Sequence, residues 1–468
     1  MKSFNKNALL YIYFDDAVKY KIFPWNINSG ILHVLIEEGR EDAQIFLQEL
    51  ENKENIKIIL EFAPPKNILR YINLYYSMVM KDEKAGEDIK NAYRSHSASV
   101  FLDKLLFWAL KKRSGDIHMF YLADLLLIRF RIDGMLNTFC FIDKNFGEDL
   151  IRAVKIRSNI EPSRVLKSKD GRMTYEYENG ITDIRISIVP SIQGDKLHMR
   201  LLNDKNIPTD LENLIHDKAQ KTLIETYLKK KSGFILITGP TGSGKSTSMR
   251  CFIDSLNDGE KHIMSVEDPV EYVIDGVTQI QTDNTENFHS ALKSALRQDP
   301  DVLAIGEIRD GESCKVAVES ALAGGYIIAT LHTKNASSAV ERMSGLGTDT
   351  TQLAASLGII INQRLVRILC PNCRKEIEYD DEDIPSLKLK HKDKLFTQAG
   401  CEKCGYVGFV RRQSIFEIIS VNDKMRLEIR EHGTFKADNT QIETQVIQLL
   451  KNGEIILKDA FSLIGTDK

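Results

Sequence analysis

The stretch Phe234-Ile-Leu-Ile-Thr-Gly-Pro-Thr-Gly-Ser-Gly-Lys-Ser-Thr247 contains a complete G-x-x-x-x-G-K-[ST] motif. Its apolar residues run directly into a glycine-rich turn, and Ser-Met-Arg-Cys-Phe-Ile-Asp, which follows, has the pattern of a helix. This strand, loop and helix context is the one in which the motif cradles phosphates. Gly239, Gly242 and Gly244 let consecutive backbone N–H groups face one phosphate chain, and the helix adds its positive N-terminal end. We therefore expect a nucleoside triphosphate to bind here.

Individual loop residues have separate expected roles. Lys245 can reach the β and γ phosphates, and the Ser246 hydroxyl can ligate Mg²⁺. A chance glycine turn is the alternative interpretation, and the common register of strand, lysine and serine argues against it. The expected nucleotide-binding set is Gly239, Pro240, Thr241, Gly242, Ser243, Gly244, Lys245, Ser246 and Thr247.

Length and composition describe an ordinary globular protein. The 468 residues predict two to four domains, and 43% hydrophobic with 28% charged residues is typical of soluble proteins. A formal net charge of −3 gives no bulk attraction to nucleic acid or anionic lipid, although a local basic patch stays open. The sequence has no run of eighteen apolar residues, so we expect a cytosolic protein that reaches a membrane only through a partner.

The pattern along the chain predicts three structured parts joined by two linkers. Residues 1–80 read as a small N-terminal α/β module with strands near 30–36 and 56–60 and helices near 42–51 and 68–80. The polar stretch 81–97 reads as a linker, and 98–205 as a β-rich domain with a hairpin turn at Asn179-Gly180. A second linker covers 206–217. The nucleotide-binding domain then takes 218–468, with cysteine pairs within 370–404 and a helical part over 413–468.

Carboxylates and one histidine stand at the ends of apolar strands that follow the phosphate loop. The stretch 263–271 reads as an apolar strand that ends in three carboxylates, Glu267, Asp268 and Glu271, and 301–310 reads as a buried strand that terminates in Gly306-Glu307. Such strand ends line the nucleotide edge of a P-loop sheet, where Glu307 could hold Mg²⁺ and another carboxylate could activate water. A solvated acidic turn is the alternative. The stretch 326–333 reads as a further strand with His332 near its polar end, where this histidine is either structural or a γ-phosphate sensor. Arg309 could contact phosphate or a neighbouring subunit, or form an exposed salt bridge.

Seven cysteines include two C-x-x-C pairs. Twenty-seven residues separate Cys373 from Cys401, a spacing consistent with two knuckles that close on one Zn²⁺. A redox dithiol is disfavoured because there are two pairs and neither begins a thioredoxin-like helix. Four thiolates would leave no open position for catalysis, so we expect a structural zinc. Its ligands are Cys370, Cys373, Cys401 and Cys404.

Taken together, these motifs resemble the ATPases of type II secretion and type IV pilus assembly. The resemblance rests on four motifs in order and on weaker matches before and after them. The four motifs are Gly239 to Thr247, Val266-Glu-Asp-Pro-Val-Glu271, Leu296-Arg-Gln-Asp-Pro-Asp to Gly-Glu-Ile-Arg-Asp310, and Ala329-Thr-Leu-His-Thr333. The matches before and after them are Ser114-Gly-Asp-Ile-His118, Arg129-Phe-Arg-Ile-Asp-Gly134 and Asn362-Gln-Arg-Leu-Val-Arg367. The match runs from about residue 98 to the C-terminus, and residues 1–80 are faintly similar to part of the family's docking domain.

The resemblance implies an α/β fold in which a RecA-like P-loop domain follows a PAS-like α/β domain, assembled as a homo-hexamer. ATP would lie between the two domains, and arginines of the PAS-like domain would close over the phosphates. The matching arginines are Arg131, Arg185 and Arg200. By the same analogy Glu271 is the first choice for the water-activating carboxylate, Glu267 the second, and Glu307 and Ser246 hold Mg²⁺.

Departures from the family pattern mark specific positions. Gly324-Gly325 stands where the family usually has Gly-His, so only His332 carries over, and Lys293 replaces a common arginine. The family's Gly-Arg-x-Gly becomes Gly408-Phe-Val-Arg-Arg-Gln-Ser-Ile415. The resemblance predicts a motor that acts on an inner-membrane platform protein to assemble a pilus or pseudopilus. A nucleic-acid motor and a nucleotide-regulated scaffold without turnover are the alternatives, and no nucleic-acid partner is expected.

Overall fold

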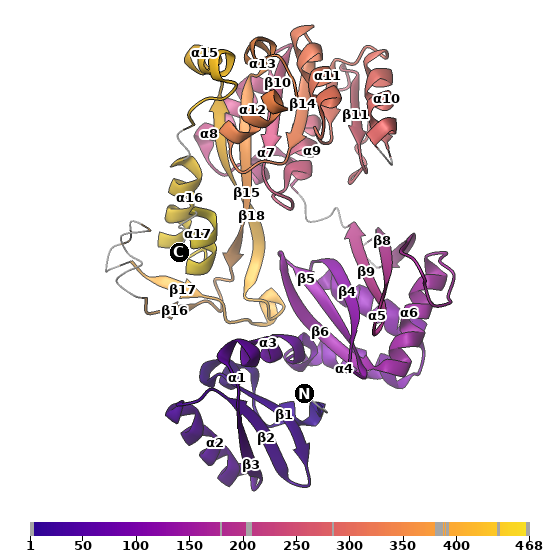
Figure 1. The fold of residues 1–468 in the computed structure, drawn as a ribbon, viewed down its shortest axis with the longest axis vertical. Helices are drawn as coiled ribbons and strands as arrows, with labels where there is room; N and C mark the ends of the chain where they lie inside the picture. Colours follow the sequence, from indigo (N-terminus) through magenta and orange to yellow (C-terminus); the bar gives the residue numbers. More distant parts are fainter. Residues whose placement is uncertain are drawn as a thin grey trace. The chain divides into compact units, whose positions relative to one another are not determined.

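The computed structural model describes residues 4–177, 180–202, 208–282, 285–379, 387, 389, 393–437 and 440–464. The chain divides into two compact units, residues 1–203 and 204–468, and each is described by itself. Figure 1 shows the elements of both units. The mixture of helices and sheets confirms the predicted α/β class.

A three-stranded sheet in the order β1-β2-β3 forms the N-terminal module. Strands β2 (Ile31–Ile36) and β3 (Lys57–Phe62) confirm the two expected strands, and α2 (Glu41–Glu54) and α3 (Pro65–Tyr75) confirm the helices. The pattern missed β1 (Ile22–Asn28), where Pro24 interrupts the strand and the register with β2 shifts. The remaining elements of the module are η1 (Lys6–Leu10), α1 (Phe14–Tyr20) and η2 (Met78–Met80).

Residues 81–97 contain a helix, so the prediction of a plain linker is wrong there. Helix α4 spans Glu83–Arg94 and begins at the cap Asp82, whose carboxylate accepts the Ala85 amide. It buries Ala85, Ile89 and Ala92, three residues at helical spacing, and packs on α5. Two of the three are alanines, and so the apolar stripe stood out weakly from the polar residues around it.

A six-stranded antiparallel sheet forms the second half of the first unit, in the order β6-β5-β4-β9-β8-β7. Helices α5 (Ala98–Lys111) and α6 (Lys144–Arg157) pack against it. The hairpin pairing of β7 with β8 is as predicted, and Asn179 lies outside the described residues. The strands are β4 (Ser114–Leu122), β5 (Leu125–Ile132), β6 (Met135–Asp143), β7 (Lys169–Tyr177), β8 (Gly180–Ser191) and β9 (Gly194–Leu202).

The second unit is built on a seven-stranded sheet in the order β12-β11-β13-β14-β10-β15-β18. All neighbouring pairs are parallel except the last, in which β18 runs antiparallel to β15. The strands are β10 (Gly233–Thr238), β11 (Ile263–Glu267), β12 (Thr278–Gln281), β13 (Val302–Ile305), β14 (Tyr326–Leu331), β15 (Ile359–Leu369) and β18 (Phe409–Ser420). Of the expected linker 206–217, residues 206 and 207 lie outside the described residues, and α7 (Leu211–Leu214) buries both of its leucines.

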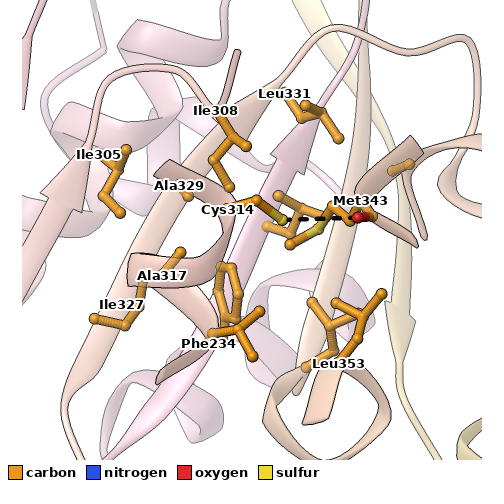
Figure 2. Close-up of a cluster of buried hydrophobic side chains, with 14 of the residues drawn as sticks. Phe234, Ile305, Ile308, Cys314, Ala317, Ile327, Ala329, Leu331, Met343 and Leu353 are labelled. Carbon is orange, nitrogen blue, oxygen red and sulfur yellow. Dashed lines mark hydrogen bonds between the residues drawn. The ribbon is translucent and has the colours of Figure 1, made fainter. Parts of the chain in front are cut away.

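Both faces of this sheet are covered, which explains why its central parallel strands β10, β13 and β14 are almost entirely apolar and buried. On β10, Phe234 and Leu236 belong to one buried cluster, while Ile235 and Ile237 belong to the other. Figure 2 shows the first cluster, where Phe234 lies among Ala317, Ile327 and neighbouring side chains. The helices of these layers are α8 (Lys218–Leu228), α9 (Lys245–Leu256), α10 (Thr285–Leu296), α11 (Gly311–Leu322), α12 (Ala336–Gly345) and α13 (Thr350–Ser356).

The C-terminal part is helical only after Ser420, so the predicted helical range 413–468 begins too early. Residues 413–420 belong to β18, which pairs with β15 along almost its whole length. Between these strands lie the short pair β16 (Lys375–Ile377) and β17 (Leu395–Thr397) and the turn η4 (Glu402–Cys404). The helices after β18 are α15 (Asp423–His432), α16 (Thr440–Lys451) and α17 (Leu457–Ile464).

Candidate functional site

Three adjacent parallel strands bring the motif residues of the second unit to one edge. The last residue of β10, Thr238, pairs with Leu331 of β14, so the phosphate loop and His332 begin side by side. Strand β13 pairs with β14 on its other side, with Ile305 opposite Ala329, and this places Glu307 at the same edge. Register alone therefore joins residues that are far apart in sequence, such as Thr238 and Leu331.

The phosphate loop requires glycine at two close approaches. Gly239 has φ +153°, and a Cβ there would lie 2.5 Å from the Gln363 carbonyl oxygen and from Ser243 Oγ. Gly244 has φ +91°, and its Cβ would lie 2.8 Å from Gln363 Nε2. Helix α9 begins at the next residue, so its N-terminal amides face the loop. A side chain at position 239 would therefore overlap with Gln363 and Ser243.

Lys245 is folded against its own loop. Its Nζ donates to the carbonyl oxygens of Gly239 and Pro240 at 3.0 and 3.2 Å and lies 3.2 Å from His332 Nδ1. Burial lowers the pKa of the Lys245 amine to about 8, although the Glu307 charge acts in the opposite direction. The amine therefore has its donors occupied before any phosphate is present.

His332 connects this lysine to the Glu307 carboxylate. Because an ammonium group has no acceptor, Nδ1 of His332 accepts from Lys245, and the ring proton lies on Nε2. Nε2 then donates to Glu307 Oε1 at 3.2 Å. Burial and the Lys245 charge both lower the pKa of His332, which favours the neutral imidazole that this arrangement needs. His332 thus lies between Lys245, the predicted phosphate ligand, and Glu307, the predicted metal ligand.

Arg309 holds the other oxygen of Glu307. Its Nε donates to Glu307 Oε2 and its Nη1 to Asp268 Oδ2, both at 2.8 Å. The salt-bridge alternative for Arg309 is therefore the observed one, and it joins the ends of two neighbouring strands.

The two carboxylates after β11 lie in different environments. Glu267 is buried and accepts from Ser265 Oγ at 2.7 Å and from Gln279 Nε2 at 3.1 Å. Burial raises its pKa, which the two hydrogen bonds partly offset. Glu271 is only partly buried, and its charge acts on Lys245. A carboxylate with two fixed partners suits a supporting role, and the more open Glu271 is the better candidate to contact water.

Sequence reasoning gave no role to Gln363, which supports the loop from the neighbouring strand β15. Its buried side chain accepts from Ser248 Oγ at 2.8 Å and donates to Ser414 Oγ at 3.3 Å. Next to it, Arg364 donates to the Asn362 side chain and to the carbonyl of Lys334, close after His332. The motif Asn362 to Arg367 was the available signal, but only the pairing of β10 with β15 shows what these residues contact.

The four predicted zinc ligands converge. Cys370 and Cys401 Sγ atoms lie 3.8 Å apart, as do those of Cys373 and Cys404. Sulfur atoms about 2.3 Å from one tetrahedral ion are separated by about 3.8 Å, so the donor set fits zinc. Backbone amides of Gly400 and Gly408 donate to Cys373 and Cys404 Sγ at 3.3 and 3.2 Å, which favours thiolates.

The three predicted arginines belong to the first unit, where they share one face of the six-stranded sheet. Successive cross-strand pairs form a series: Arg131 pairs with Asp116, Asp116 with Arg200, Arg200 with Arg185, and Arg185 with Arg172. The last three arginines line a cavity of about 470 Å³. We call these five residues the arginine row. Arg172 was missed because only strand register reveals that it continues the series.

Comparison with known proteins defines the family. The model of the family described as "Type II/IV secretion system protein" matches residues 93–464. The chain belongs to this family. It is 37% identical over 334 residues to the type II secretion system protein E of Dickeya dadantii, and this match covers 71% of the chain and 67% of the relative. It is 31% identical to the type IV pilus assembly ATPase PilB of Thermus thermophilus, over 88% of the chain and 48% of that protein. The family resemblance predicted from the motifs is confirmed.

Two solved structures share the fold. The Legionella pneumophila ATPase DotB superimposes with a TM-score of 0.56 at 19% identity, over 78% of the chain and 95% of DotB. The pilus retraction motor PilT gives 0.51 at 24% identity, over 78% of the chain and 97% of PilT. In the described part of the chain, no helix is long and apolar enough to cross a membrane.

Proposed function

We propose that this member of the secretion family is a cytoplasmic hexameric ATPase that powers assembly of a type IV pilus or a secretion pseudopilus. One observation carries the proposal: Lys245, His332 and Glu307 form a continuous chain of contacts at the ends of three parallel strands. Each comes from a different motif of the family. The relatives named as a type II secretion system protein E and a pilus assembly ATPase support the same process.

In this mechanism the loop binds the triphosphate of ATP. Its backbone amides and Lys245 contact the phosphates, and Lys245 exchanges its bonds to Gly239 and Pro240 for bonds to phosphate oxygens. Ser246 and Glu307 would hold Mg²⁺, which neutralises phosphate charge when bound. His332, already hydrogen-bonded to both Lys245 and Glu307, registers whether the γ phosphate is present.

Glu271 is the proposed water-activating carboxylate. It lies near enough to Lys245 to influence its pKa and, unlike Glu267, keeps solvent contact. Proton abstraction requires an ionised carboxylate that reaches a water molecule. Glu267, whose Oε1 accepts hydrogen bonds from both Ser265 and Gln279, would instead stabilise the end of β11, which precedes Glu271.

Arginines of the first unit would add positive charge to the catalytic site. Arg131, Arg185 and Arg200 stand in one cross-strand row, an arrangement suited to a chain of phosphate oxygens. Their guanidinium groups would neutralise charge that develops on the transferred phosphoryl group. A homo-hexameric ring would bring such a row and a phosphate loop together in each site.

The remaining parts supply attachment and support. The PAS-like domain would span residues 98–205, and the N-terminal module of residues 1–80 would dock the motor to components of the inner-membrane platform. Structural Zn²⁺ on Cys370, Cys373, Cys401 and Cys404 would hold the insertion together. The acidic net charge gives no support to a nucleic-acid motor.

Phosphate release by the full chain tests the proposal. Wild-type protein should hydrolyse ATP, and Glu271→Gln and Glu307→Gln should each reduce kcat strongly, by at least about a hundredfold. Glu319→Gln, on the exposed face of α11, is the matched control and should retain activity. A scaffold without turnover would show no activity that either change could remove. Stimulation of hydrolysis by DNA, lost at high salt, would instead favour the nucleic-acid motor.

A further inference from the structure

Asp116 is the only acidic residue in the arginine row. It is paired with Arg131 on one side and with Arg200 on the other, so two guanidinium groups share its carboxylate. Arg200 Nε donates to Oδ1 at 3.1 Å, and Arg131 Nε lies 3.4 Å from Oδ2. His198 Nε2 also lies 2.9 Å from Oδ1. The side chain is only 13% exposed, whereas those of Arg131 and Arg200 are 40% and 54% exposed.

Both arginines contact Asp116 through Nε and not through the outer end of the guanidinium. Among the described residues, the terminal nitrogens of Arg200 make no hydrogen bond, and this side chain lines the 470 Å³ cavity. Within the described part of the chain, the terminal nitrogens of Arg131 make only a 3.2 Å bond to the Gly134 carbonyl and a 3.5 Å contact with His118. A guanidinium held by Nε keeps its two-nitrogen fork for a bidentate partner, the geometry that phosphate prefers.

We propose that Asp116 is a positioning residue that fixes Arg131 and Arg200 with their terminal nitrogens directed to the nucleotide phosphates. The inference rests on the proposed role of these arginines in ATP hydrolysis. Asp116 itself touches no substrate. It acts by removing rotational freedom from two long side chains and by relieving the repulsion between adjacent guanidinium groups.

Several surrounding features agree with a fixed, ionised Asp116. Hydrogen bonds from His198 and Arg200 outweigh the effect of burial and lower the pKa of Asp116 to about 2. The His118 and His198 rings stack at 4.6 Å on the same face of the sheet, two residues along β4 and β9 from Asp116 and Arg200. Together these contacts hold the carboxylate on its strand, so the positions of the two arginines follow from the sheet register.

A mutant cycle in the full chain tests the proposal. The variants are Asp116→Asn, the pair Arg131→Ala with Arg200→Ala, and the triple combination, each measured for kcat, KM for ATP and melting temperature. Asp183→Asn is the matched control, because Asp183 extends from β8 two residues from Arg185 and bonds Thr174 instead of an arginine. We expect Asp116→Asn to lower kcat by about tenfold to a hundredfold with KM for ATP changed less than threefold.

The outcome of the cycle separates this inference from the proposed function. If Asp116 acts through the arginines, Asp116→Asn causes no further loss of kcat in the chain that already lacks both. A full additional loss there, or wild-type kcat for Asp116→Asn beside an inactive arginine pair, would overturn the inference alone. Wild-type kcat for the arginine pair would overturn the proposed role of the arginines. A melting temperature that drops in parallel with kcat across all variants would assign Asp116 to folding and also contradict the proposal.

Discussion

The Lys245 ammonium and the His332 imidazole lie 3.2 Å apart, and this contact fixes which nitrogen of the histidine carries the proton. Because the lysine can only donate, Nδ1 accepts and Nε2 donates to Glu307. The phosphate loop is therefore linked by hydrogen bonds, through a neutral histidine, to Glu307, the proposed Mg²⁺ ligand. Any ligand that displaces Lys245 from His332 changes the hydrogen bonding of Glu307 as well.

Nucleotide binding should take up a proton at mildly alkaline pH. With a pKa of about 8, the Lys245 amine is largely neutral at pH 8.5 in the free protein. Phosphate charge favours the protonated form and raises the pKa, so a substantial fraction of one proton enters on binding. Calorimetric titration with ATP in two buffers of different ionisation enthalpy measures this number. In Lys245→Arg the guanidinium is always charged, so binding that persists should take up no proton at this position.

His332 should make the second unit sensitive to acid. Its folded-state pKa is lowered, so between that value and about 6.5 the unfolded chain binds more protons than the folded chain. The stability linked to His332 is therefore complete above about pH 6.5 and is lost as the pH falls. Melting temperatures at pH 7.5 and 5.5 should differ more for wild type than for His332→Gln, which cannot titrate. An equal difference in both proteins would show that the imidazole is not held neutral.

The cysteine cluster should contain one zinc ion per chain. Cys373→Ser removes one of four ligands and should reduce bound zinc, measured by atomic emission, and lower the melting temperature. Cys314→Ser is the control, because Cys314 is buried in the cluster of Figure 2 and lies outside the ligand set. Retention of a full equivalent of zinc by Cys373→Ser would contradict the assignment.

The buried ion pair between Lys155 and Asp195 should be a large contributor to the stability of the first unit. Lys155 Nζ lies 2.6 Å from Asp195 Oδ2, and the two side chains are 3% and 8% exposed. Lys155 also donates to the Ser163 carbonyl at 2.7 Å. Asp195→Ala leaves the ammonium buried without its counter-charge and should cost about 3–5 kcal/mol in urea unfolding. Asp149→Ala breaks an exposed pair with Arg152 and should cost less than about 1 kcal/mol. Similar losses for both would show that Lys155 reaches solvent.

Local patterns were enough to predict the strands and motif residues of the nucleotide edge. Phe234 to Ile237 is continuously apolar and Gly239 follows after Thr238, so both the strand and the loop follow from adjacent residues. The local pattern could not separate Glu267 from Glu271, and only the family resemblance ranked them, because the burial of Glu267 depends on Ser265 and on Gln279 from β12. Two glutamates four residues apart carry no mark of that difference.

Residues that act across strands were the hardest to predict. Asp116 and Arg200 are 84 positions apart, and only the pairing of β4 with β9 brings them together. Arg172 entered the row for the same reason, through β7 and β8. Hydrophobic alternation identifies which face of a strand is buried, but it leaves the register between distant strands open.

The cysteine cluster joins the two ends of the chain segment that connects β15 to β18. Cys370 directly follows β15, and four residues separate Cys404 from the start of β18 at Phe409. The two strands remain paired up to Leu369 and Phe409. The segment between the two knuckles therefore starts and finishes at the same place, whatever its length. Because the entropy of closing such a loop grows only slowly with its size, this segment can gain or lose residues with little effect on the sheet. A change of length in this segment would leave the nucleotide edge of the sheet unchanged.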